Sequence, residues 1–438
     1  MRRVQARAAV ASALLAALAV AAGAETLAFT GARLIPIAGP EIEAGTLVVA
    51  DGRIVAVGRV GEVAIPAGAE VRDLAGRTIL PGFVDTHSHL GRGSGGDASG
   101  PLHPEVRILD AVDVRSKNFW KARAGGVTTL NVMPGSGHLL SGQTVYLKPR
   151  ASGSTIESWL VCVDAERTIC GGLKMANGTN SQGSPPFPGT RGRSAALQRG
   201  LFVRALDYRA KLERAGSDAA KRPDRDLGLE AVVEALAGRR VVHFHTHRHD
   251  DIATALRMAA EFGLRPVLHH LAGGVPMAAE IARAGLPASI TVIDAPGGKL
   301  EALDASWTLG GELERAGVDV AIHTDDAVTD SRFLLRSAAL AVRGGMTRDK
   351  ALEALTLAPA RMLALDARLG SLSPGKDADF VVLSGDPFAV ATRVEETWIE
   401  GVGVYERARD GHYLAGGRDV YPQNADHSDH TTSQEGFE

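Results

Sequence analysis

Cysteine is scarce in this chain: Cys162 and Cys170 are the only two among its 438 residues. We do not count these two residues as metal ligands. They lie close in the sequence, and an exported protein can pair such residues across a short loop. Two buried cysteines with free thiols are the alternative, and the sequence favours neither state.

Long hydrophobic runs are also few. The only extended one is Ala8–Ala22, interrupted by Ser12; three arginines precede it and Ala22-Gly23-Ala24 ends it. It is shorter than the roughly 20 residues that cross a bilayer, and its flanks are typical of a secretory signal peptide over residues 1–24. An uncleaved membrane anchor is the alternative. We expect a mature protein without a membrane segment, exported to the periplasm or secreted.

An excess of positive charge is missing as well. The chain has 48 Lys and Arg against 51 Asp and Glu, a formal charge of −3, and loss of the three leader arginines changes it to −6. This argues against nucleic acid as a partner. The 45% hydrophobic content fits a large domain plus a smaller one, with possible homo-oligomers. Only residues 416–438, which form a polar tail, depart from this globular composition.

The two ends of the chain share one pattern. Residues 25–80 and 366–415 contain short β-type runs separated by glycines, which predicts that both ends build one small β-sandwich. Residues 81–365 alternate strand-like runs with helical periodicity, which is typical of a parallel (β/α)8 barrel. A doubly wound open sheet is the alternative.

Eight strand candidates fall in the central region, followed by helices such as Val106–Ala124 and Leu300–Ala316. The strands are Gly82–His87, Val127–Val132, Thr144–Leu147 or Trp159–Val163, Ile169–Met175, Val241–Thr246, Pro266–His270, Ser289–Ile293 and Val318–Thr324. In such a barrel the reactive groups lie at the carboxyl ends of the strands.

The first strand ends in a chelating pattern. Side chains alternate along a strand, so His87 and His89 point the same way. Neutral imidazole is the commonest ligand for zinc-like ions. The pair therefore predicts metal binding, against the plainer interpretation of two unrelated surface histidines.

A lysine follows in the fourth candidate strand. Lys174 lies within an apolar stretch, where a buried charge must be paired, neutralised or modified. Carboxylated, it becomes a carbamate with two oxygens that can bridge two cations. A salt-bridged Lys174 is the alternative interpretation, and Lys148 is the less favoured candidate for the bridging role.

The fifth, sixth and eighth strands add further polar side chains. His243, His245, His247 and His249 follow one another at period two, and we choose His245 as the ligand at the mouth, with His243 deeper and His247 second. Neighbours on a strand point to opposite faces, so only one of the next histidine pair faces inward, and we choose His270. Asp325 ends the eighth strand as ligand and proton acceptor, whereas Asp326 could simply cap the next turn.

The residues match a family. From about Leu27 to Tyr405 the chain resembles the amidohydrolase superfamily, in particular its imidazolonepropionase-related branch. The most specific pieces are Leu80–His89, the His245 strand and Gly370–Phe380. The resemblance implies a list of metal ligands: His87, His89, His245, His270 and Asp325, with Lys174 as the carboxylated bridging lysine.

The resemblance also implies a function, which acts on a small-molecule substrate. We expect hydrolysis of a carbon–nitrogen bond in an amide, cyclic amide or dipeptide by a hydroxide that bridges two divalent ions, zinc by preference, or one ion if Lys174 is unmodified. Asp325 would act as general base and then general acid. Arg191 is a weak candidate for a substrate carboxylate. A deaminase of a small heterocycle and an inactive binding protein on the same scaffold are the rivals.

Overall fold

The computed structural model describes residues 26–91, 96–164, 166, 168–293, 299–326 and 328–410. The predicted leader over residues 1–24 and the predicted polar tail over residues 416–438 lie outside this range. Among the described residues, no helix combines the length and the apolar character that a bilayer crossing requires.

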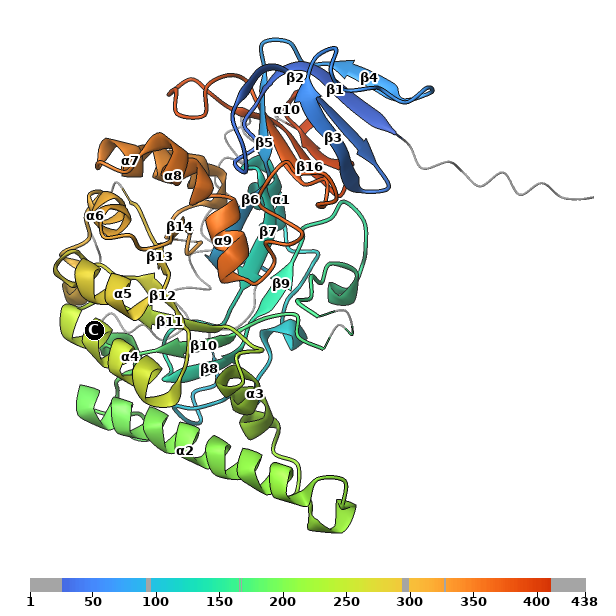
Figure 1. Ribbon diagram of the computed structural model, residues 1–438. Coiled ribbons are helices and arrows are strands. Elements are labelled where there is room, and N and C mark those ends of the chain that lie inside the picture. The colour runs from blue at the N-terminus through green and yellow to red at the C-terminus, as the bar shows by residue number, and fades with distance from the viewer. Residues whose placement is uncertain are drawn as a thin grey trace, which may run out of the picture.

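The two chain ends form one β domain, seen in blue and red in Figure 1. Its eight strands are hydrogen-bonded in the order β17-β16-β15-β5-β1-β2-β3, with β4 beside β1. The N-terminal strands are β1 (Leu27–Leu34), β2 (Ile42–Ala50), β3 (Arg53–Arg59), β4 (Glu70–Asp73) and β5 (Thr78–Pro81), and the C-terminal strands are β15 (Phe380–Leu383), β16 (Val394–Ile399) and β17 (Val402–Glu406). The predicted composite domain is confirmed, as one continuous sheet.

Aromatic packing and one strand pair join these ends. Phe29 of β1 contacts Phe380 and Trp398 with ring centroids 5.0 Å away in each case. The antiparallel pairing of β15 with β5 places Phe380 opposite Pro81, directly before the first strand of the second domain. The β domain therefore holds the entry point of that domain in place.

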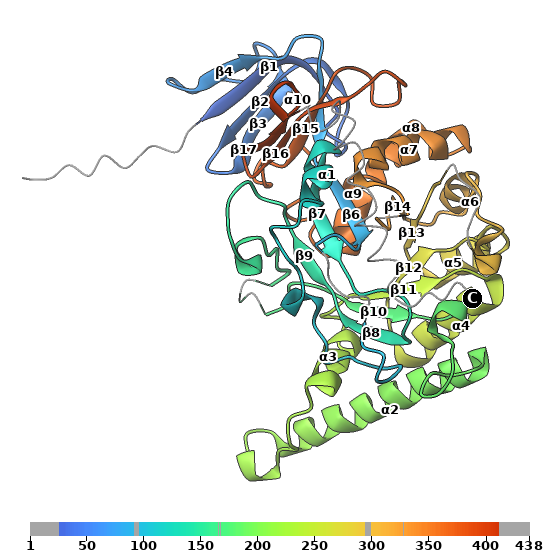
Figure 2. The same cartoon turned by 180° about the vertical axis from the view of Figure 1, so that it is seen from behind.

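The second domain is a ring of strands surrounded by helices (Figure 1 and Figure 2). Parallel pairs join β6 to β7 and link β10 through β14 in sequence order. The strands are β6 (Phe83–Ser88), β7 (Val127–Val132), β8 (Leu140–Gln143), β9 (Val145–Leu147), β10 (Leu173–Ala176), β11 (Val242–Thr246), β12 (Val267–His270), β13 (Ala288–Ile290) and β14 (Val320–Ile322). The predicted α/β barrel is confirmed.

The third position of the ring differs from the prediction in direction. It is filled by β8 and β9 together, with β9 antiparallel to β7 and β8 antiparallel to β10. The connection from β7 to β8 spans only residues 133–139, and a parallel crossover needs a dozen residues or more. The chain therefore turns back instead of crossing over.

The ring closes between its first and last strands. Ser88 pairs with Asp326, and the amide of Asp325 donates a 2.9 Å hydrogen bond to the carbonyl of His87. Asp85 lies wholly buried beneath this seam, where its Oδ1 accepts from the amides of His87 at 3.1 Å and Thr324 at 3.2 Å. These bonds fix the carboxyl ends of β6 and β14 side by side.

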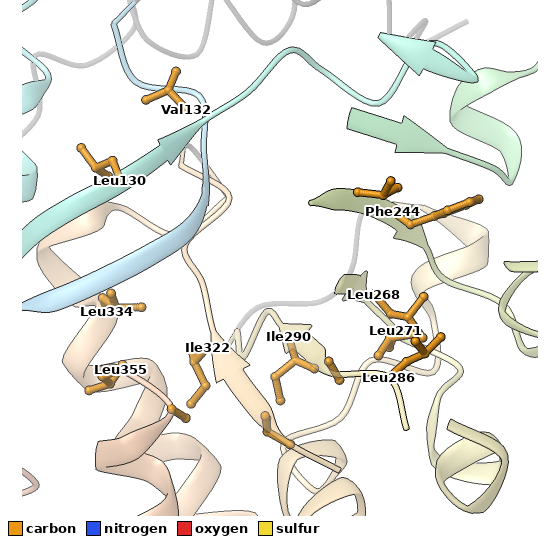
Figure 3. Packing of buried hydrophobic residues seen from close by; sticks show 14 of the residues in the cluster. Leu130, Val132, Phe244, Leu268, Leu271, Leu286, Ile290, Ile322, Leu334 and Leu355 are labelled. Carbon is orange, nitrogen blue, oxygen red and sulfur yellow. The ribbon is translucent and has the colours of Figure 1, made fainter. Parts of the chain in front are cut away.

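Helices cover the outside of the ring. They are α1 (Phe119–Ala124), α2 (Arg191–Ala215), α3 (Leu227–Leu236), α4 (His249–Phe262), α5 (Ala278–Ala284), α6 (Leu309–Arg315), α7 (Leu334–Arg343), α8 (Arg348–Glu353), α9 (Leu357–Met362) and, in the β domain, α10 (Arg407–Asp410). Phe244, Leu268, Ile290 and Ile322 belong to the hydrophobic cluster that packs the strands (Figure 3). The residues that alternate with them consequently face the interior.

Two predicted helices are shorter than expected. The helix predicted over Val106–Ala124 is confined to α1, because residues before it bond to a strand: the carbonyl of Val106 accepts from the amide of Gln143 at 2.7 Å. The helix predicted over Leu300–Ala316 is confined to α6. Cys162 and Cys170 form a disulfide, which decides between the two states left open above.

Candidate metal centre

Asp325 lies among three imidazoles at the seam of the ring. Its Oδ1 is 3.1 Å from His89 Nε2 and 3.4 Å from His87 Nε2, and its Oδ2 is 3.8 Å from His270 Nδ1. The ends of β6 and β12 thus bring imidazoles to the carboxylate that follows β14, as the parallel-barrel interpretation requires.

His89 is held in an informative orientation. Its Nδ1 lies 2.8 Å from the carbonyl of Met133, which can only accept, so Nδ1 carries the hydrogen. Nε2 is therefore the nitrogen that faces Asp325. A bound metal would use the lone pair of this nitrogen together with a carboxylate oxygen of Asp325.

His270 reaches the centre because the strand ends there. Its φ angle is 73° and that of Leu271 is 57°, both in the left-handed region. The alternation of side chains therefore breaks, and His269 faces inward as well, with Nδ1 3.1 Å from His87 Nδ1. The expectation that only one of the two histidines faces inward is wrong for this reason. Asp325 also has a positive φ, 50°, and such angles concentrate at functional sites.

His245 stands on the other side of His270. Their ring centroids are 4.4 Å apart, and those of His245 and His247 are 4.7 Å apart. Asn180, from the loop after β10, lies with Nδ2 3.4 Å from His245 Nε2, and its Oδ1 accepts a 3.0 Å hydrogen bond from Lys299. Sequence reasoning missed Asn180 and Lys299, because both lie in loops without a periodic pattern.

Lys174 lies at the bottom of this cluster. It is wholly buried, with Nζ 3.0 Å from His87 Nε2 and 3.1 Å from Met133 Sδ. Lys148, the other candidate, is placed elsewhere: its Nζ is 2.7 Å from Asp377, 2.9 Å from Asp379 and 3.1 Å from Glu400. Lys148 therefore joins the two domains, and Lys174 alone is available to the histidines.

Burial determines the charge states at the centre. It lowers the pKa of His87, His245 and His270 well below the usual 6.5, and nearby cationic groups add to the effect, so these rings are neutral. Burial alone would raise the pKa of Asp325, but the hydrogen bond from His89 and nearby positive charge outweigh it and hold this pKa well below its usual range. Neutral imidazoles beside an ionised carboxylate are what a divalent metal requires.

The donor atoms fit metal binding. Three groups have ligand atoms within 4.8 Å of one another, and each of them includes His87 or His270: His87, His270 and Asp325; His245, His247 and His270; His87, His269 and His323. In the part of the chain that the structure describes, His245 Nδ1 and His270 Nε2 are buried without a hydrogen-bond partner. Such orphaned nitrogens cost free energy unless a ligand satisfies them.

Two further predicted residues have other contacts. Asp326 Oδ2 accepts from both the amide and the hydroxyl of Ser331 at 2.7 Å, so it caps the next turn. Arg191 donates to Asp251 at 2.9 Å and lies 3.5 Å from Glu301. Its guanidinium is already engaged by two carboxylates, and its contact with a substrate stays a prediction.

Sequence reasoning missed His269 and His323 as parts of the cluster. His323 Nε2 is 3.3 Å from His270 Nδ1, and its Nδ1 is 2.8 Å from the hydroxyl of Ser289. The signal was present in the sequence, because His323 precedes Asp325 by two positions and thus shares its face of the strand.

Known proteins match this chain both in sequence family and in fold. A family model described as "Amidohydrolase family" matches residues 167–405. The crystal structure of an amidohydrolase from Thermotoga maritima MSB8 is 32% identical with a TM-score of 0.80, and the match covers 87% of this chain and 100% of that one.

Curated relatives match over similar lengths of this chain. An imidazolonepropionase of Symbiobacterium thermophilum is 26% identical over 377 residues, 78% of this chain and 84% of the relative. "Amidohydrolase tasK" of Hapsidospora irregularis is 27% identical over 371 residues, again 78% of this chain, and the matched region spans 38% of that longer relative.

Proposed function

The chain belongs to the amidohydrolase family, and from this premise we propose that it hydrolyses a carbon–nitrogen bond in a small amide, cyclic amide or dipeptide with divalent metal. The observation that carries the proposal is the convergence of His87, His89, His270 and the ionised Asp325 on one point, with ligand atoms 3.1 to 3.8 Å apart.

The ligands divide into two sets. His87, His89 and Asp325 would hold one ion, and His245 and His270 would hold a second. Lys174, beside His87 and wholly buried, would reach both ions once carboxylated. With an unmodified lysine a single ion is expected. Zinc suits this set of imidazole and carboxylate donors.

Bound divalent ions would supply a water molecule of lowered pKa and polarise the substrate carbonyl. The protein supplies the proton transfers. Asp325, ionised because its pKa lies below the usual range, accepts the proton of the attacking water on a carboxylate oxygen. It then donates this proton to the leaving nitrogen, so one side chain serves as base and acid in turn.

Metal analysis combined with a substrate panel tests this proposal. We expect at least one divalent ion per purified chain, and release of a carboxylate and an amine from members of a panel of N-acyl amino acids, dipeptides and cyclic amides. A chelator should abolish the activity and added zinc should restore it. Ammonia release without a new carboxylate would instead indicate the rival deaminase. A chain that neither holds metal nor turns over any substrate would be the inactive binding protein.

We also propose that the protein is exported, on the basis of the leader-like residues 1–24 and the Cys162–Cys170 disulfide, which an oxidising compartment favours. In denatured protein purified from its native host, a thiol assay should detect no free thiol before reduction and two per chain after it. Thiols already free would contradict export, and an N-terminus before residue 24 in the mature protein would show that the leader is retained as a membrane anchor.

A further inference from the structure

Beneath the metal centre, four side chains form a line of hydrogen bonds. His87 Nδ1 is 3.1 Å from His269 Nδ1, His269 Nε2 is 3.0 Å from His243 Nδ1, and His243 Nε2 is 3.1 Å from the hydroxyl of Tyr146. All four residues are at most 1% exposed, so water does not compete for these bonds. A barrel interior usually contains branched aliphatic side chains at this depth.

The direction of this line is fixed at its upper end. Lys174 Nζ is 3.0 Å from His87 Nε2, and a protonated lysine only donates. His87 Nε2 therefore carries a lone pair and its hydrogen is on Nδ1. A metal ion in place of the lysine nitrogen makes the same demand, because it also needs the lone pair.

The direction of the other bonds follows from the geometry of the line. Each bond holds one hydrogen, and an imidazole that accepts at one nitrogen has its hydrogen on the other. His87 donates to His269, His269 donates to His243, and His243 must then donate to Tyr146. The opposite direction would place a hydrogen on His87 Nε2, where it meets the lysine or the metal.

At the lower end of the line, the hydroxyl oxygen of Tyr146 accepts the hydrogen bond from His243. Burial raises the pKa of Tyr146, so its hydroxyl stays neutral and accepts through an oxygen lone pair. Gly172 leaves room for the ring of His243, because a Cβ at that position would lie 2.4 Å from His243 Cδ2. The imidazole is thus held against the hydroxyl by its surroundings.

We propose that Tyr146 is a positioning residue for the metal centre: as terminal acceptor it fixes the tautomers of His243 and His269 and so presents Nε2 of His87 to the metal. The inference rests on the proposed function in that His87 serves as a ligand. It assigns a role to a tyrosine from the antiparallel strand β9, which offers no ligand of its own.

Tyr146→Phe removes the acceptor and leaves a buried N–H on His243 without a partner. Reversal of all three tautomers would satisfy that N–H only by protonating His87 Nε2. We expect affinity for zinc, measured on the full chain by competition with a fluorescent chelator, to fall about 10- to 100-fold. In metal-free protein, the 15N shifts of the histidine rings should show the hydrogen of His87 moving from Nδ1 to Nε2.

Matched variants separate this role from a loss of packing. Tyr208→Phe is the control, because Tyr208 also bonds through its hydroxyl, 3.5 Å from Glu230, outside the line. His243→Gln keeps an oxygen that accepts from His269, whereas His243→Leu does not. We expect His243→Gln to bind zinc nearly as the unmodified chain does, His243→Leu to lose as much affinity as Tyr146→Phe, and Tyr146→Phe to add nothing on the glutamine background.

Zinc affinity of Tyr146→Phe within twofold of the Tyr208→Phe control would overturn the inference, as would equal losses in the two His243 variants. If Tyr146→Phe does not fold, the two His243 variants decide the matter. Failure of the proposed function looks different: the unmodified chain would bind no zinc, while the ring nitrogens of its metal-free form would still report the direction of the line.

Discussion

Asp325 is the side chain on which the proposed proton transfers depend. Asp325→Asn keeps the shape and tolerates the left-handed backbone, since φ is 50° and asparagine adopts such angles readily. It cannot carry the proton, so we expect turnover to fall at least about a hundredfold with the unfolding temperature little changed. Asp326→Asn is the control: it weakens a cap and should keep most of the activity.

Both variants are compared by initial rate, metal content and thermal unfolding. Turnover in Asp325→Asn at the level of the unmodified chain would remove Asp325 from the reaction. An inactive Asp326→Asn of normal stability would show that the two carboxylates have been assigned in the wrong order.

Lys174 determines how many ions the centre holds. If its carbamate bridges two ions, Lys174→Ala should lower the metal content from two ions per chain to one, and acetate or propionate should restore part of the activity by occupying the space. Elemental analysis after gel filtration measures the stoichiometry. The same stoichiometry in both proteins would show that the lysine does not bridge.

At the scale of single residues, periodicity predicts which side chains face the centre but not how they contact one another. His87, His245 and Asp325 are predicted at strand ends, and the structure places the first and last side by side and His245 beside His270; their role as ligands stays a prediction. His269 was assigned outward, because a positive φ at His270 has no sequence signature in a non-glycine residue.

At the scale of elements, apolar runs predict strands and leave their direction open. Thr144–Leu147 was one of two candidates for the third strand, and β9 occupies Val145–Leu147 within it. Its antiparallel direction follows from the short connection after β7, in which the run Pro134-Gly135-Ser136-Gly137 is a turn signal that could have predicted the reversal. The segment Val106–Ala124 has helical spacing, yet its first residues pair with β8 at Gln143, a tertiary effect that local propensity does not contain.

The antiparallel strand β9 has a structural consequence of its own, because it carries Lys148 to the β domain. This ammonium is buried among Asp377, Asp379 and Glu400. Lys148→Met would leave buried carboxylates uncompensated, and we expect it to cost about 3–5 kcal/mol of stability. Lys350→Met, which removes an exposed pair with Glu353, should cost less than about 0.5 kcal/mol.

Urea titrations of the two lysine variants measure this difference. Equal midpoints would show that the buried pair adds no stability beyond a surface pair. A lower midpoint in Lys148→Met with unchanged cooperativity would show that the two domains unfold as one unit.

At the scale of the molecule, the joining of both chain ends into one domain could be predicted, since each end shows the same glycine-separated strands. The order of the strands could not, because many pairings bury the same apolar faces. The ionic contact between the domains was also missed: Lys148 is 229 positions from Asp377 and 252 from Glu400, and charges at such separations show no pattern.

This contact makes the whole molecule sensitive to acid. Burial alone would raise the pKa of Glu400, but the hydrogen bond from Arg150 and the charge of Lys148 hold it at about 2, against a usual 4.5. A carboxyl whose pKa is lowered by folding stabilises the folded state fully above its unfolded pKa and loses that contribution as the pH falls through the folded value. Burial raises the pKa of Asp379, which has the opposite sign and offsets part of the loss.

Glu400→Gln removes the contribution that the charge of Glu400 makes to the free energy of unfolding. We expect the variant to be less stable at pH 7, on the order of 2 kcal/mol, and the difference from the unmodified chain to shrink between pH 4.5 and pH 2. Urea midpoints across that range measure it, and Arg150→Gln should give a smaller change of the same sign, since Arg150 donates to both oxygens of Glu400 at 2.7 Å. A difference that stays constant with pH would mean that Glu400 contributes through packing and not through its charge.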